Sequence, residues 1–72
     1  MLEKRSVSLS GHRTSVALEP EFWAALGALA EKRGVTVAAL VGTVDETRQA
    51  SQALASALRV FVLKEVKKET LF

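Results

Sequence analysis

The sequence predicts a mainly α domain with one short β-strand, and three observations carry this prediction. Apolar and polar residues alternate with a period of two over residues 12–18, which is typical of a half-buried strand. Two stretches, 20–33 and 36–48, instead repeat apolar residues every three or four positions, as amphipathic helices do. A third stretch, 51–68, is apolar around most of its circumference, which predicts a helix that is buried against more than one neighbour.

The strand at 12–18 has to find a hydrogen-bonding partner, because its N–H and C=O groups cannot stay unpaired. Its alternate side chains point to opposite faces, so Arg13, Ser15 and Ala17 face outward together. The simplest partner is the same strand of a second copy, in an antiparallel ribbon about a two-fold axis. This arrangement predicts a homodimer whose shared core contains Thr14, Val16, Leu18, Phe22, Leu26, Leu40, Val41 and Val44.

We expect residues 1–11 to form an N-terminal arm that bends away from the strand. Val7 and Leu9 also alternate with polar residues, but an unbroken strand would place them on the outward face. Gly11 can absorb this mismatch, because glycine tolerates positive φ. A hairpin closed at this glycine is the alternative. It would place Val7 opposite Val16, and it would occupy the strand edge that a second copy needs or widen the ribbon.

The ends of the helices follow from local chemistry. Pro20 suits the first helical turn, where no N–H is needed, and Gly34 follows two cations at the end of the same helix. Thr36 is a suitable N-cap for the second helix. We expect Leu71 and Phe72 to fray unless a dimer holds them.

Length and composition limit the class of protein. The chain has 72 residues, which is one small domain, and it contains no cysteine and one histidine. Disulfides are therefore ruled out and a structural metal is not expected, which leaves oligomerisation as the source of added stability. The sequence contains no long apolar segment of the kind that signal peptides and membrane spans need, so we expect a cytoplasmic protein with no membrane partner.

The distribution of charge says more than the net charge of +2. Four basic residues lie in the first 13 positions beside one acid, Glu3, and three lysines lie near the C-terminus. Such clusters suit a polyanionic partner, although a solvated surface is the alternative.

No arrangement of residues typical of an enzyme is present. The sequence has no paired nucleophile and base, no carboxylate pair and no glycine-rich phosphate loop. His12 is a single imidazole without cysteine or acidic companions at ligand spacing. We therefore predict a protein without catalytic activity, metal or cofactor.

The order of strand, helix, glycine turn and helix resembles the ribbon-helix-helix family of dimeric bacterial DNA-binding proteins. The additional C-terminal helix is typical of a subfamily. The segments that carry the resemblance are Lys4-Arg5-Ser6-Val7, Gly11-His12-Arg13-Thr14-Ser15, Leu18-Glu19-Pro20-Glu21-Phe22-Trp23, Arg33-Gly34 and Ser56-Ala57-Leu58-Arg59-Val60-Phe61-Val62-Leu63.

The resemblance implies a two-stranded ribbon that enters the DNA major groove. Carried over by position, the base-contacting residues are Arg13, Ser15 and Ala17, and the start of the second helix holds a phosphate. The side-chain chemistry agrees, because arginine can donate two hydrogen bonds to guanine and a helix N-terminus attracts anions. The residues expected to contact the DNA backbone are Lys4, Arg5, His12, Thr36, Val37 and Ala38.

Two hypotheses follow from these residues. The first is a homodimeric, sequence-specific DNA-binding protein that regulates transcription. The second is a dimeric protein-interaction module, an antitoxin-like or adaptor subunit, with weak or no DNA binding. Ala17 and Ala38 motivate the second, because relatives often have polar residues there, and so does the unusually apolar third helix.

Overall fold

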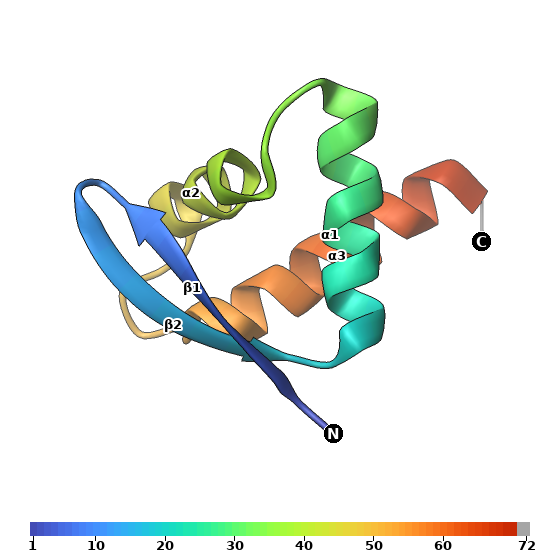
Figure 1. Cartoon of the computed structure of the whole chain (residues 1–72). Coiled ribbons are helices and arrows are strands. Elements are labelled where there is room, and N and C mark those ends of the chain that lie inside the picture. The colour runs from blue at the N-terminus through green and yellow to red at the C-terminus, as the bar shows by residue number, and fades with distance from the viewer. Residues whose placement is uncertain (71–72) are drawn as a thin grey trace.

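The computed structural model describes residues 1–70 and shows a β-hairpin packed against three helices (Figure 1). In this structure, β1 packs on α2, while β2 packs on α1 and α3. The expectation about residues 71–72 lies outside the described residues. The elements in chain order are β1 (Glu3–Leu9), β2 (His12–Leu18), α1 (Pro20–Arg33), α2 (Val37–Thr47) and α3 (Leu54–Thr70).

The hairpin corrects the expected path of residues 1–11. These residues are not an arm that bends away, because residues 3–9 form β1 and pair antiparallel with β2 of the same chain. The backbone partner of residues 12–18 is therefore β1, and the inference that a second copy must supply it was wrong. The ladder satisfies one edge of β2 within the chain, and an intersubunit ribbon stays a prediction.

A two-residue turn determines which side chains of the two strands share a face of the hairpin. Ser10 and Gly11 both have positive φ, at 50° and 82°, which is the backbone that two-residue hairpin turns require. Val7 consequently pairs with Thr14 rather than with Val16. In this register the inner face of the hairpin carries the valines and leucines of both strands, and the serines of β1 share the outer face.

The caps of α1 and α2 follow the local sequence. Pro20 is the first residue of α1, and Gly34 ends the helix in the left-handed conformation with a φ of 68°. Its N–H donates to the carbonyls of Ala30 and Glu31. Thr36 caps α2 by accepting a hydrogen bond from the N–H of Ala39 at 3.0 Å. Compared with the expected ranges, α2 is one residue shorter at each end, and α3 begins and ends later.

A single chain encloses its own hydrophobic core. Side chains from the inner face of the hairpin and from all three helices are buried in it. Of the residues expected to form a dimer core, Thr14 and Phe22 are only half-buried, whereas the others are buried within this chain. The buried residues are Val7, Leu9, Val16, Leu18, Trp23, Leu26, Leu29, Ala30, Leu40, Val41, Val44, Ala57, Leu58 and Val62.

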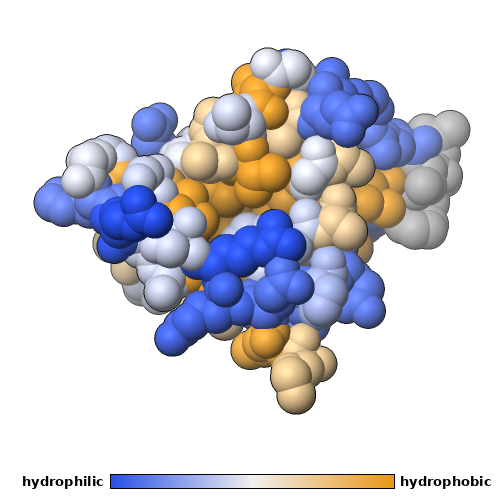
Figure 2. All heavy atoms as spheres, in the orientation of Figure 1, coloured by the Kyte–Doolittle hydropathy of each residue, from blue (hydrophilic) through white to orange (hydrophobic). Residues whose placement is uncertain are grey.

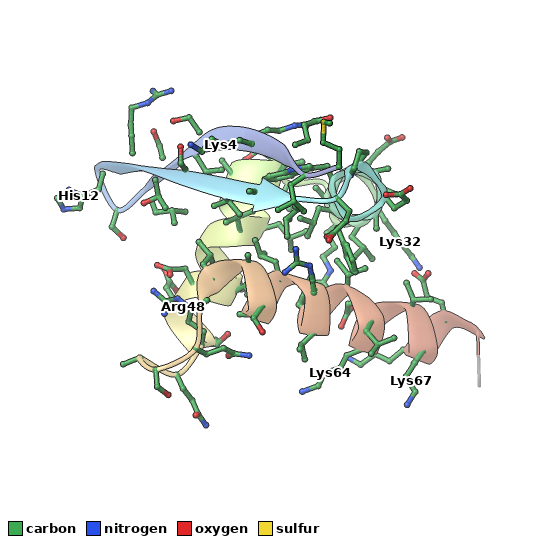
Figure 3. All side chains as sticks on the ribbon, turned by 90° about the horizontal axis from the view of Figure 1, so that it is seen from below. Lys4, His12, Lys32, Arg48, Lys64 and Lys67 are labelled. Carbon is green, nitrogen blue, oxygen red and sulfur yellow. The ribbon has the colours of Figure 1, made fainter. Side chains whose placement is uncertain are left out.

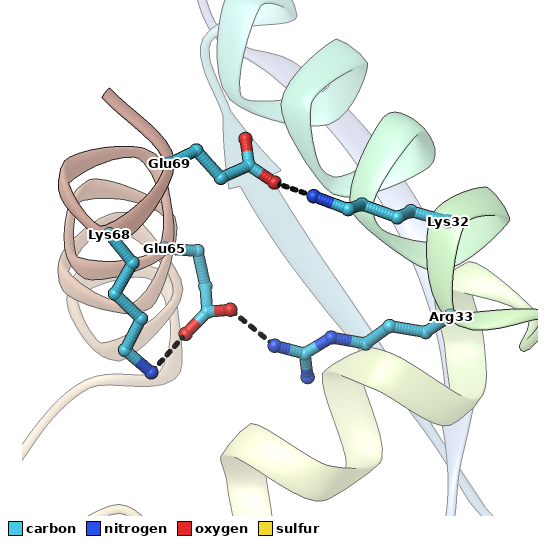
Figure 4. Close-up of polar contacts among 5 residues, drawn as sticks. All are labelled: Lys32, Arg33, Glu65, Lys68 and Glu69. Atoms are coloured by element: carbon cyan, nitrogen blue, oxygen red, sulfur yellow. Dashed lines mark hydrogen bonds and ion pairs between the residues drawn. The ribbon is translucent and has the colours of Figure 1, made fainter. Parts of the chain in front are cut away.

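Helix α3 is fixed to α1 by ion pairs on one side. Figure 4 shows Lys32 paired with Glu69, and Arg33 paired with Glu65, which also pairs with Lys68.

The other side of α3 departs from expectation. The helix is not buried all round, because Val60 and Leu63 are 39% and 56% exposed.

The turn gives a matched pair of glycine substitutions. A Cβ at Gly11 or at Gly27 would meet no atom within 4 Å, so the two sites differ in backbone conformation rather than in space. Gly11→Ala should destabilise the protein by about 1–2 kcal/mol, because φ is positive there. Gly27→Ala lies inside α1 and should stabilise it by about 0.5–1 kcal/mol. Urea unfolding measures both, and equal effects would contradict the left-handed turn.

A second prediction concerns pH. The guanidinium of Arg59 donates two hydrogen bonds to the carboxylate of Glu19, with Nε–Oε1 and Nη2–Oε2 distances of 2.9 and 3.2 Å. These hydrogen bonds hold the pKa of Glu19 below its usual 4.5. A carboxylate with a lowered folded pKa stabilises the fold above its unfolded pKa, and this stabilisation is lost as pH falls through the folded value.

We therefore expect the stability difference between the parent and Arg59→Gln to be largest near neutral pH. The difference should shrink once the pH falls below about 4.5. Thermal unfolding at a series of pH values measures it. Lys64→Gln is the control, because no ion pair holds Lys64 within residues 1–70. A parent-to-Arg59→Gln difference that does not change with pH would contradict the role of this pair.

Candidate nucleic-acid interface

The outer face of the hairpin is polar and basic. Lys4 pairs with Ala17, Ser6 with Ser15, and Ser8 with Arg13, so these six residues form one face. All of them are exposed except Ala17, which is half-buried. Two cations and three hydroxyls therefore project from a ribbon that carries no acid on this face.

A tryptophan holds the start of the hairpin against α1. The indole Nε1–H of Trp23 donates to the carbonyl oxygen of Glu3 at 2.8 Å. The guanidinium of Arg5 lies over the same ring, 4.9 Å from its centre, and pairs with Glu3. Arg5 is therefore part of the hairpin's attachment to α1 and not the flexible cation that an N-terminal arm would carry.

The N-terminus of α2 lies beside the hairpin. A hollow of about 320 Å³ separates the two, and Figure 2 shows an apolar area between the hairpin and the helices, bordered by hydrophilic side chains. Because Thr36 caps Ala39, the N–H groups of Val37 and Ala38 keep no acceptor among residues 1–70. The hollow is lined by Arg5, Ser6, Val7, Ser8, Arg13, Trp23, Val37 and Ala38.

The structure thus brings together most of the residues that were expected to contact DNA. Arg13 lines the same hollow as Val37 and Ala38, although 24 positions separate Arg13 from Val37 in the chain. His12 does not share the outer face, because it pairs with Leu9 beside the turn and is exposed there. Figure 3 shows Lys4 on the hairpin side of the molecule, with Lys64 and Lys67 pointing away from the opposite side.

Two residues of the outer face were missed from the sequence. Ser6 and Ser8 stand beside Arg13 and Ser15, but they were assigned to an arm. The signal that could have found them is the alternation of serine with Val7 and Leu9, followed directly by Ser10-Gly11.

No cluster of three or more metal-ligating side chains occurs among the described residues. Across residues 1–70, no helix has the length and apolar character that a bilayer crossing requires.

Comparison with known proteins identifies the family of this chain. Its sequence matches the ribbon-helix-helix domain over residues 2–66. The chain belongs to this family. Ribbon-helix-helix domains are generally DNA-binding transcription regulators or antitoxins, and are generally not enzymes.

A solved structure has the same fold as this ribbon-helix-helix domain. It is that of an uncharacterized protein from Bordetella pertussis Tohama I, which is 30% identical, with a TM-score of 0.75. The match covers 96% of this chain and 59% of the Bordetella chain, so the domain spans less than two thirds of that protein. No curated protein matches the chain.

Proposed function

We propose that this ribbon-helix-helix domain binds double-stranded DNA through the outer face of its own hairpin and regulates transcription. The observation that carries the proposal is the exposed set of two cations and three hydroxyls, without an acid, on a two-stranded ribbon. The strands of such a ribbon lie about 4.8 Å apart, which suits a major groove that is about 12 Å wide.

Within this proposal the outer-face residues take different roles. Arg13 can donate two hydrogen bonds to O6 and N7 of guanine, and Ser15 can donate to or accept from several bases. Ala17 offers only a methyl group, which suits the methyl group of thymine. Lys4 contacts phosphate and sets the position of the hairpin without reading sequence.

The backbone contacts come from α2 and from the end of the hairpin. The free N–H groups of Val37 and Ala38 belong to the positive end of a helix dipole, and such ends bind phosphate. Thr36 acts here through its backbone position, because its hydroxyl accepts the N–H of Ala39. Arg5 adds positive charge beside the groove from its place on Trp23, and the exposed His12 can donate a hydrogen bond to a phosphate.

A homodimer stays a prediction, but its two copies would each contribute a complete hairpin instead of one strand of a shared ribbon. Pairing two copies through β2 would give four strands, about 14 Å wide before side chains are counted, which exceeds the groove. Two complete hairpins would instead read two half-sites, whose separation reports the geometry of the dimer.

The second candidate function is the protein-interaction module, antitoxin-like or adaptor. Its support is the exposed apolar side of α3, which a domain that only binds DNA does not need.

Selection from a random duplex pool, followed by salt titrations on the selected site, tests the DNA proposal. Arg13→Ala should weaken binding by about 1–3 kcal/mol, and the base preference at one position should relax. Lys4→Ala should weaken binding to all sequences alike, and should reduce the slope of log K against log salt by about one.

The control variant removes a cation from the other side of the molecule. Lys67→Ala should leave affinity and salt slope unchanged, since Lys67 lies on α3, away from the hairpin (Figure 3). The proposal fails if Arg13→Ala binds the selected site as well as the parent at every salt concentration. It also fails if the pool yields no enriched sequence.

A further inference from the structure

An apolar groove lies on the outer side of α3, and the DNA proposal does not use it. The groove has a volume of about 320 Å³, and its walls are almost entirely apolar. It is lined by Phe22 of α1 and by Val60, Val62, Leu63 and Val66 of α3, with Arg59 at its edge. Val60 and Leu63, three positions apart on the helix, stand open to solvent.

Two exposed lysines follow the exposed apolar residues of this groove along α3. Lys64 and Lys67 follow Val60 and Leu63 at helical spacing of four, and both are exposed. Neither forms an ion pair within the described part of the chain. Figure 3 shows both lysines projecting from α3, away from the hairpin.

The acids of this region are already engaged elsewhere. Glu65 and Glu69 turn toward α1, where they pair with Arg33 and Lys32 (Figure 4). Glu19, near the groove, is held by Arg59, whose guanidinium also lies 5.8 Å from the centre of the Phe22 ring. The outer side of α3 is therefore an apolar strip beside Lys64 and Lys67. The three glutamates just described are paired with other residues and do not neutralise these lysines.

This combination selects among possible occupants. Packing α3 against α3 of a second copy would add four lysines to the interface but no free carboxylate from Glu65 or Glu69, because both are already paired with α1. A nucleic-acid phosphate would satisfy the lysines but leave the valine and leucine side chains in water. A helix with an apolar stripe and acidic flanks satisfies both.

We propose that the α3 groove, centred on Leu63 and bordered by Lys64 and Lys67, docks an acidic amphipathic helix of a partner protein. The apolar residues of that helix fill the space beside Phe22 and Leu63, and its carboxylates pair with the two lysines. This surface is separate from the hairpin face, so docking and DNA binding are independent properties of the domain.

A display library of helical peptides tests the proposal, because its members cover apolar stripes flanked by acidic, neutral or basic residues. Selection on the parent domain should enrich peptides with apolar residues at helical spacing and aspartate or glutamate beside them. Leu63→Glu should weaken the enriched peptides at least about tenfold, as expected when a central apolar contact is lost. A Lys64→Glu, Lys67→Glu double variant should weaken them to a similar extent.

The controls separate docking from folding and from DNA binding. Val35→Glu changes an exposed valine outside the groove and should leave peptide affinity unchanged. Thermal unfolding verifies that Leu63→Glu still folds, since its side chain is exposed, and DNA affinity should stay at the parent value. The proposal is overturned if no peptide is enriched, if the enriched peptides are basic or uncharged, or if they bind Leu63→Glu as well as the parent. Self-association of the parent that Leu63→Glu abolishes would also overturn it, in favour of a second copy.

Discussion

The pairing of β1 with β2 within one chain is the constraint on which the rest of the molecule depends. The ladder joins seven residue pairs through a two-residue turn, and its register places the apolar side chains of both strands on the helices. Because side chains alternate along a strand, a shift of one residue would turn Arg13 and Ser15 into the core and Val16 into solvent. The outer basic face is therefore a consequence of the same register that closes the core.

The helices were the predictable part of the fold. Pro20 and Gly34 mark the ends of α1 by backbone chemistry that does not depend on the rest of the protein, and Thr36 does the same at the start of α2. The alternation over residues 12–18 also identified the strand and the side of it that carries Arg13 and Ser15. These signals are local, so they survive in a single sequence.

The partner of that strand could not be obtained in the same way. A second copy and a preceding segment satisfy the same backbone groups, and alternation in β2 does not distinguish them. The deciding residues are Ser10 and Gly11, whose positive φ values close a hairpin. The exposure of Leu63 was missed for a related reason. Apolar residues around the whole circumference of a helix predict that other elements pack on every side, but they do not show whether those elements belong to the same chain.

With the hairpin complete within one chain, the molecule has two separate surfaces of different character. The basic outer face and the N-terminus of α2 lie around one hollow, whereas Lys64, Lys67 and the apolar strip of α3 lie on another side. One small chain thus offers a polar surface suited to a nucleic acid and an apolar surface suited to a protein.

The most direct measurement is an isotope-filtered NMR experiment on a mixture of labelled and unlabelled chains. In antiparallel pairs without mutual hydrogen bonds the Cα atoms approach most closely, so the pairs Lys4–Ala17, Ser6–Ser15 and Ser8–Arg13 should give strong cross-strand Hα contacts. The account predicts that these contacts appear within one labelled chain and are absent from the spectrum filtered for contacts between chains. Contacts between β2 strands of different chains, with β1 unpaired, would contradict it.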